Sequence, residues 1–247
     1  MKNKMIFAFI FLISVVTVRI LMHNVFHIFD FSPIIVAIAF ILILRDKFSL
    51  IKFKRFNPLP FFSIIIITYI LMFFMILIQT HFKLSEFSMP KSNIILGDII
   101  IALILGLTEE TAWRGYLFSK LKELTWLQIT IIISLIWSIW HIPTHYYSLE
   151  GRFWISFPLF IVSCFEFGII MQYLRVKADS VIPSVLFHAF MIIPLMSSGM
   201  QSKVLYLGSF PSIIMLLLFL PLTIYCYRVG QRIHDNKKQL SPIIGKK

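Results

Sequence analysis

Eight apolar runs of about the length that crosses a bilayer dominate this sequence of 247 residues. Hydrophobic residues make up 59% of the chain and charged residues only 14%, which is more apolar surface than a soluble domain of this size can bury. Because lipid offers no water to backbone N–H and C=O groups, we predict an all-α, polytopic membrane protein. The runs lie at about 5–22, 29–44, 58–80, 94–120, 126–144, 153–174, 180–199 and 204–227.

Basic residues are distributed unevenly between the two ends of these predicted spans. With the N-terminus inside, seventeen Lys and Arg fall on the cytoplasmic side, four fall outside, and Arg19 and Arg114 lie in the membrane, which accounts for all 23. This bias predicts a multi-pass protein of the cell membrane with both termini in the cytoplasm. We expect one transmembrane domain at 1–227 and a basic cytoplasmic tail at 228–247.

The net charge of +12 also bears on the partners of the chain. In a membrane protein such an excess is typical of cytoplasmic loops, and no basic stretch here is interleaved with aromatic residues. We therefore expect the lipid bilayer as a partner and no nucleic acid.

Three charged residues stand within six positions of the predicted span 94–120. Glu109, Glu110 and Arg114 follow a nearly uncharged run, although each charge at mid-bilayer costs about 2.5–3.5 kcal/mol by insertion scales. Glu110 and Arg114 are four residues apart, so they share a helix face and can form an ion pair. Glu109 points about 100° away and stays available as a base. The alternative is a structural pair that locks two helices together.

Two histidines in other predicted spans extend this acidic cluster. At a rise of 1.5 Å per residue, Glu109, His141 and His188 fall within about two helical turns of one level. These three residues can therefore belong to one intramembrane site, enclosed by about eight helices. The alternative is that each histidine is a hydrogen-bonded core residue.

The order of these groups resembles a known family of membrane proteins. Glu-Glu-x-x-x-Arg at 109–114, Trp137-x-x-x-His141 and a later helix with His188 are similar to the CAAX protease and bacteriocin-processing family, CPBP or Abi, of intramembrane proteases. The resemblance covers about 94–199. It implies an endopeptidase that activates water to hydrolyse a peptide bond in a membrane-associated peptide or protein.

Roles for individual residues follow from that resemblance. Glu109 would be the base, with Glu110 and Arg114 as its supports. His141 and His188 would orient the water, stabilise the oxyanion or bind a metal. A divalent metal such as zinc is proposed for some members of the family and disputed for others, and its ligands here would be Glu109, His141 and His188.

Two positions depart from the family pattern. Trp137 stands where the family favours Phe, and Ile192 stands where Asn or Asp usually follows the last histidine by four residues. We hypothesise that Glu166, another intramembrane carboxylate, is an auxiliary group that partly replaces the missing polar side chain. The alternative for Glu166 is an ion pair or a water-facing position.

Ile192 also supports a function of a different class. A catalytically weakened family member would act by binding, as a membrane scaffold in bacteriocin immunity or in a surface-protein pathway. A proton-coupled transporter would use the same buried acids and histidines as a relay. Transporters of that kind show repeated halves with broken helices, and the sequence shows no such symmetry.

Overall fold

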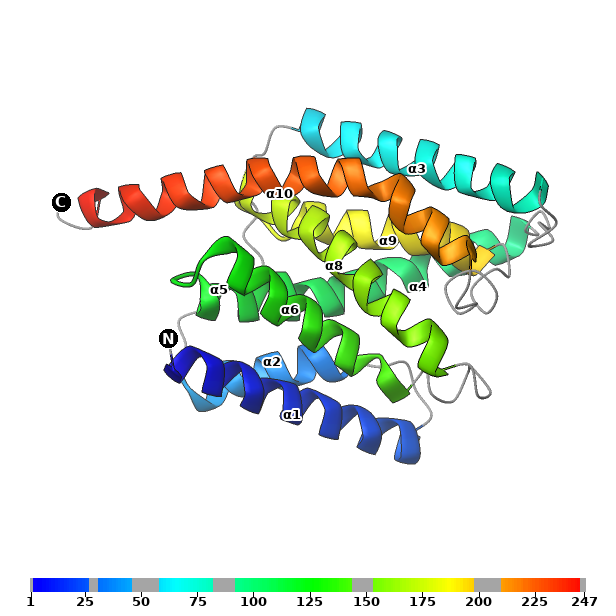
Figure 1. Ribbon diagram of the computed structural model, residues 1–247. Coiled ribbons are helices and arrows are strands. Elements are labelled where there is room, and N and C mark those ends of the chain that lie inside the picture. Colours follow the sequence, from blue (N-terminus) through cyan, green and yellow to red (C-terminus); the bar gives the residue numbers. More distant parts are fainter. Residues whose placement is uncertain are drawn as a thin grey trace.

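The computed structural model describes residues 2–26, 31–45, 58–81, 92–143, 153–197 and 210–244 (Figure 1). This part of the chain is helical and contains no strand, which confirms the all-α prediction. The elements are α1 (Lys2–Phe26), α2 (Ser32–Ile43), α3 (Pro58–His81), α4 (Ser92–Glu110), the π-helix η1 (Thr111–Leu117), α5 (Phe118–Leu121), α6 (Trp126–Trp140), α8 (Phe153–Ala178), α9 (Ile182–Ser197) and α10 (Phe210–Ile244).

Several of these helices have the length and apolarity of membrane spans. Among the described residues, three helices are long and apolar enough to cross a membrane, and four further apolar helices are shorter. Because α4, η1 and α5 run on without a break, the described residues form eight continuous helices, as the sequence predicts for a polytopic membrane protein. The predicted positions 29–30, 144, 198–199 and 204–209 lie outside the described residues. The long spans are Lys2–Met22, Phe157–Ala178 and Ile213–Gln239.

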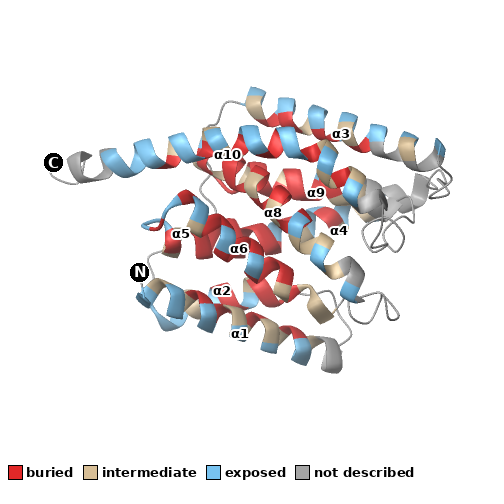
Figure 2. Cartoon of the chain, viewed as in Figure 1, coloured by how far each residue is buried: buried red, intermediate tan, exposed pale blue. Residues whose placement is uncertain are grey.

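The continuous helix α4–η1–α5 lies inside the bundle. It contacts α9 along α4 and contacts α2, α6 and α8 along η1, and every residue from Thr108 to Phe118 is buried. Buried residues concentrate on the inner helices, whereas α1, α3 and the far end of α10 present exposed faces (Figure 2). A helix segment that is buried on all sides has no surface left for lipid. Its charged residues are therefore shielded from lipid.

The polar ends of several helices gather at one end of the bundle. Lys4 pairs with Glu123 at 3.4 Å, and Lys238 Nζ donates to the Glu123 carbonyl at 2.7 Å. Lys237 Nζ donates to the Val176 carbonyl at 2.9 Å. Both termini lie toward this end (Figure 1). Here α10 continues as a helix through residues 228–244, which the sequence predicts as a separate tail.

A glycine sets the distance between α4 and α9. A Cβ atom added to Gly106 would lie 2.7 Å from the Val185 carbonyl oxygen and 3.4 Å from the Ala189 nitrogen. Both neighbours are backbone atoms, which cannot rotate away as a side chain can. Small residues allow this close approach between membrane helices. The contact matters for the site, because Glu110 follows one turn later on α4 and His188 lies beside Ala189 on α9.

We expect Gly106→Ala to destabilise the protein, and Gly97→Ala to serve as the matched control. Alanine gains up to about 1 kcal/mol in helix propensity over glycine at either position. At Gly106 the overlap with α9 should cost about 1–3 kcal/mol and outweigh that gain, whereas nothing lies within 4 Å of a Cβ at Gly97. Thermal unfolding in detergent compares the two variants. Equal melting temperatures would contradict the close-packing argument.

Candidate active site

The two adjacent glutamates lie where an α-helix widens into a π-helix. Glu109 and Glu110 end α4, and η1 follows at once. Single π-turns are rare and occur frequently at functional sites. On η1 the Arg114 carbonyl accepts a hydrogen bond from another helix, because Arg175 Nε on α8 donates to it at 3.2 Å. No residue type in the sequence signals this π-helix.

Glu110 and Arg114 form the ion pair that their spacing predicts. Arg114 Nη1 lies 2.8 Å from Glu110 Oε1, and neither side chain has any exposed surface. The Arg114 guanidinium also lies 5.0 Å from the centroid of the Trp137 ring. Because both charges are out of water, removal of either partner would leave the other unpaired at high cost. The pair therefore fixes the conformation of η1.

His188 binds the same carboxylate oxygen from α9. Its Nδ1 lies 2.9 Å from Glu110 Oε1, and the side chain is almost fully buried. A carboxylate only accepts hydrogen bonds, so Nδ1 carries the hydrogen and donates it. In the neutral imidazole, Nε2 then bears the lone pair. Glu110 thus orients His188, as carboxylates do for imidazoles that act as ligands or bases.

Glu109 stays outside the ion pair, as its position on the helix predicts. Trp137 Nε1 on α6 donates to Glu109 Oε2 at 2.8 Å. Only 4% of the Glu109 surface is exposed, and its carboxylate interacts electrostatically with His188. The structure therefore brings together three segments of the chain: α4–η1 with Glu109 and the Glu110–Arg114 pair, α6 with Trp137, and α9 with His188.

His141 joins this group through Trp137. It caps the C-terminal end of α6, and its Nδ1 lies 2.9 Å from the Trp137 carbonyl oxygen. The centroid of the Trp137 ring lies 5.7 Å from that of His141 and 5.7 Å from that of His188. The Trp137 ring therefore contacts both imidazoles.

The donor set does not fit a divalent metal. Trp137 donates to Glu109 Oε2, which leaves Oε1 as a free donor atom, and Nδ1 of His188 is engaged with Glu110, which leaves Nε2. Within the described ranges, no three His, Cys, Asp or Glu side chains are close enough to share a metal ion. A structural zinc site uses four ligands and a catalytic one uses three. We therefore derive no catalytic step through a metal.

Glu166 is buried on α8, away from this cluster. A Cβ added to Gly168 would lie 2.5 Å from Ser134 Oγ and 3.4 Å from Arg114 Nη2, so that face of α8 meets the site. Glu166 is two residues earlier and points about 200° away around the helix. Its Oε2 has no hydrogen-bond partner among the described residues. The auxiliary role of Glu166 remains a prediction.

Arg19 reaches the site from α1, whereas the sequence predicts it only as a basic residue in the membrane. Its Nη1 donates to the Trp140 carbonyl, and its guanidinium lies 4.0 Å from the Trp140 ring centroid. Arg19 also interacts electrostatically with Glu109. A buried arginine in an otherwise apolar run was the signal in the sequence, but its partner depends on how α1 packs against α6.

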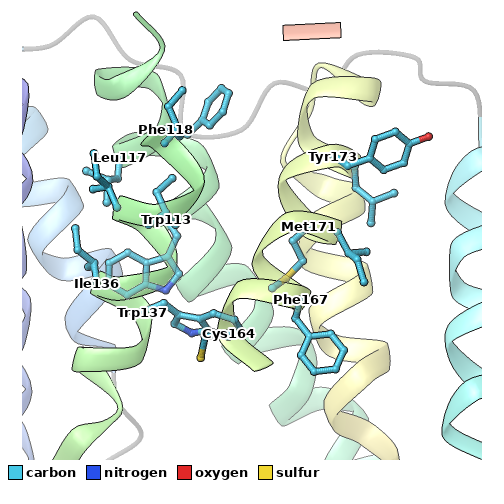
Figure 3. Packing of buried hydrophobic residues seen from close by; sticks show 14 of the residues in the cluster. Trp113, Leu117, Phe118, Ile136, Trp137, Cys164, Phe167, Met171 and Tyr173 are labelled. Carbon is cyan, nitrogen blue, oxygen red and sulfur yellow. The ribbon is translucent and has the colours of Figure 1, made fainter. Parts of the chain in front are cut away.

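Apolar side chains surround these polar groups. Trp113, Leu117 and Phe118 extend from the helix that carries the site, and Phe167 and Met171 extend from α8 (Figure 3). They belong to one continuous buried cluster that links these helices. The site therefore has a packed support on the side of η1 and α8.

Comparisons with known proteins agree with this geometry. Residues 91–193 match the family model described as type II CAAX prenyl endopeptidase, Rce1-like. CAAX prenyl protease 2 of Methanococcus maripaludis is 29% identical over 100 residues, an alignment that covers 36% of each protein. The match thus spans about a third of the length of this curated relative. The resemblance to the CPBP family is confirmed over residues 91–193, which contain Glu109, Glu110, Arg114, His141 and His188 and are similar to Rce1-like CAAX endopeptidases of membranes.

Proposed function

We propose that this chain is an intramembrane endopeptidase that hydrolyses a peptide bond in a membrane-associated peptide or protein. One observation carries the proposal. Glu110 holds Arg114 and His188, while Glu109 lies outside the ion pair as a second buried carboxylate, bound by Trp137, whose ring also contacts His188. Two carboxylates with separate roles next to an oriented histidine are suited to the activation of water.

Glu109 acts as the general base in the mechanism that we propose. It takes one proton from a water molecule. The Nε2 lone pair of His188 accepts a hydrogen bond from the other O–H group and so orients the water. The water oxygen then bonds to the carbon of the scissile carbonyl. Glu109 returns its proton to the leaving nitrogen as the C–N bond breaks.

His141 is the candidate donor to the oxyanion in this scheme. Its Nδ1 is engaged with the Trp137 carbonyl, so a hydrogen bond to substrate would come from Nε2 of the imidazolium form. Donors aimed at a developing oxyanion are among the largest contributions to catalysis. The ion pair with Arg114 holds the Glu110 carboxylate in place, and Glu110 in turn keeps His188 in one orientation.

The substrate and the topology are parts of the same proposal. CAAX prenyl protease 2 of Methanococcus maripaludis is similar to this chain, so a prenylated peptide with a CAAX end is the first substrate to test. We propose the cell membrane as the location, with both termini in the cytoplasm. The gathering of Lys4, Lys237 and Lys238 at one end of the bundle supports this orientation.

We expect Glu109→Gln and His188→Ala to lower the rate of cleavage by about 10²–10⁴-fold, the usual contribution of a positioned acid or base. Glu123→Gln is the control, since it removes a carboxylate at the polar end of the bundle, where Glu123 pairs with Lys4, and we expect it to cleave as wild type. The purified chain in liposomes is given a farnesylated CAAX peptide and the same peptide without lipid, and mass spectrometry detects the products. Full cleavage by Glu109→Gln would refute the mechanism.

We expect chelation of metals to leave cleavage unchanged, because the described donors do not form a metal site. The measurement compares 1,10-phenanthroline with 1,7-phenanthroline, an isomer of the same shape that does not chelate. Loss of activity with the first compound alone, restored by zinc, would show that Glu109, His141 and His188 rearrange to bind metal.

A second candidate function, a binding scaffold, is favoured by Ile192. This side chain lies one turn after His188 and packs against the apolar core, so it places no polar group near the site. A weakened peptidase that acts by binding would not need its base. If the Glu109→Gln, His188→Ala double variant restores the phenotype of cells that lack this chain, the scaffold is supported; failure to restore it, at normal protein levels, supports the peptidase.

A further inference from the structure

Trp137 contacts every group to which the proposed mechanism gives a direct role. We propose that it is a positioning residue that holds the Glu109 carboxylate in one orientation for proton transfer. This inference rests on the proposed function and adds to it a residue that acts on the base rather than on the substrate. Trp137 lies in the middle of the polar cluster and is itself 4% exposed.

The indole N–H selects one oxygen of Glu109. Nε1 lies 2.8 Å from Oε2, and an indole nitrogen is a donor only. Oε2 is thereby engaged, which assigns Oε1 as the oxygen that receives the proton from water. A hydrogen bond to a charged acceptor is stronger than one between neutral groups. The low dielectric of a buried site strengthens it further.

The indole ring fixes the neighbours of the base as well. Its centroid lies 5.7 Å from the ring of His188, at 67°, and 5.0 Å from the Arg114 guanidinium carbon. The edge-to-face angle and the cation–π distance are both favourable geometries. The ring is therefore held in place by the groups on either side of Glu109. Its N–H cannot turn away without disturbing them.

The backbone of Trp137 extends the same control to His141. The Trp137 carbonyl engages His141 Nδ1 at 2.9 Å, and the two rings meet at 75°. Trp137 thus positions the Glu109 carboxylate through its side chain and the His141 imidazole through its backbone carbonyl. Displacement of a catalytic group by about 1 Å typically costs about 10²-fold in rate.

The test compares Trp137→Phe with Trp126→Phe. Both changes remove the same volume from a buried tryptophan of α6, but Trp126 lies at the other end of the helix and its Nε1 has no hydrogen-bond partner among the described residues. We expect Trp137→Phe to lower kcat by about 10- to 100-fold, the loss of one hydrogen bond to a charged group, with little change in KM. Trp126→Phe should keep kcat.

Thermal unfolding separates positioning from folding. If the melting temperature falls by the same amount in both variants and only Trp137→Phe has a lower kcat, the positioning role is supported. If Trp137→Phe keeps the kcat of wild type, or if Trp126→Phe loses as much kcat at the same melting temperature, the role is overturned.

A spectroscopic measurement tests the hydrogen bond without a substrate. The Raman band of indole that reports N–H hydrogen bonding is isolated for Trp137 by subtracting the Trp137→Phe spectrum from that of wild type. We expect a hydrogen-bonded signature that is lost when the same subtraction is made in a Glu109→Ala background. An unchanged signature would refute the hydrogen bond from Trp137 to Glu109. Because this measurement uses no peptide, its outcome does not depend on whether a cleaved substrate is found.

Discussion

A carboxylate removed from water, that of Glu110, holds the centre of this molecule together. One of its oxygens accepts from Arg114 on η1 and from His188 on α9, so the charge is met by partners from two helices. In a low-dielectric interior a charge without a partner is far more costly than the pair itself. The two helices therefore keep a single register, and the close approach at Gly106 brings their backbones near enough for the contact.

That constraint frees the neighbouring carboxylate for chemistry. Because Arg114 is committed to Glu110, Glu109 has no direct ion pair with it and meets instead the N–H of Trp137. The 100° step between adjacent helical residues produces this division, since it sends the two carboxylates to different neighbours. A rigid carboxylate–imidazole unit and a separately held base then lie next to each other. A water molecule placed between Glu109 and His188 would meet an acceptor on each side.

The sequence predicts those features that depend on local spacing. The helices, the Glu110–Arg114 pair at four residues and the separate direction of Glu109 all follow from periodicity and hydropathy. The sequence does not predict the features that depend on packing between helices. The π-helix has no residue signature. The N–H of Trp137 meets Glu109 because of how α6 packs against η1. Glu166 faces away because α8 is turned to place Gly168 at the site. Arg19 and its partner are 121 residues apart.

Helices outside the matched segment 91–193 complete the site at the end of α6. A helix leaves the carbonyls of its last turn without partners, and each of them needs a donor where water is scarce. The Trp137 carbonyl is engaged by the His141 ring, and the Trp140 carbonyl accepts from Arg19 on α1. The Trp140 indole in turn donates to Ser32 Oγ on α2 at 2.9 Å. Without α1 and α2 the end of α6 would lose two hydrogen bonds and a cation, and His141, the next residue along the chain, would lose its fixed place beside the cluster. The N-terminal helices are therefore part of the architecture of the site, although the residues that carry the chemistry all lie in the matched segment.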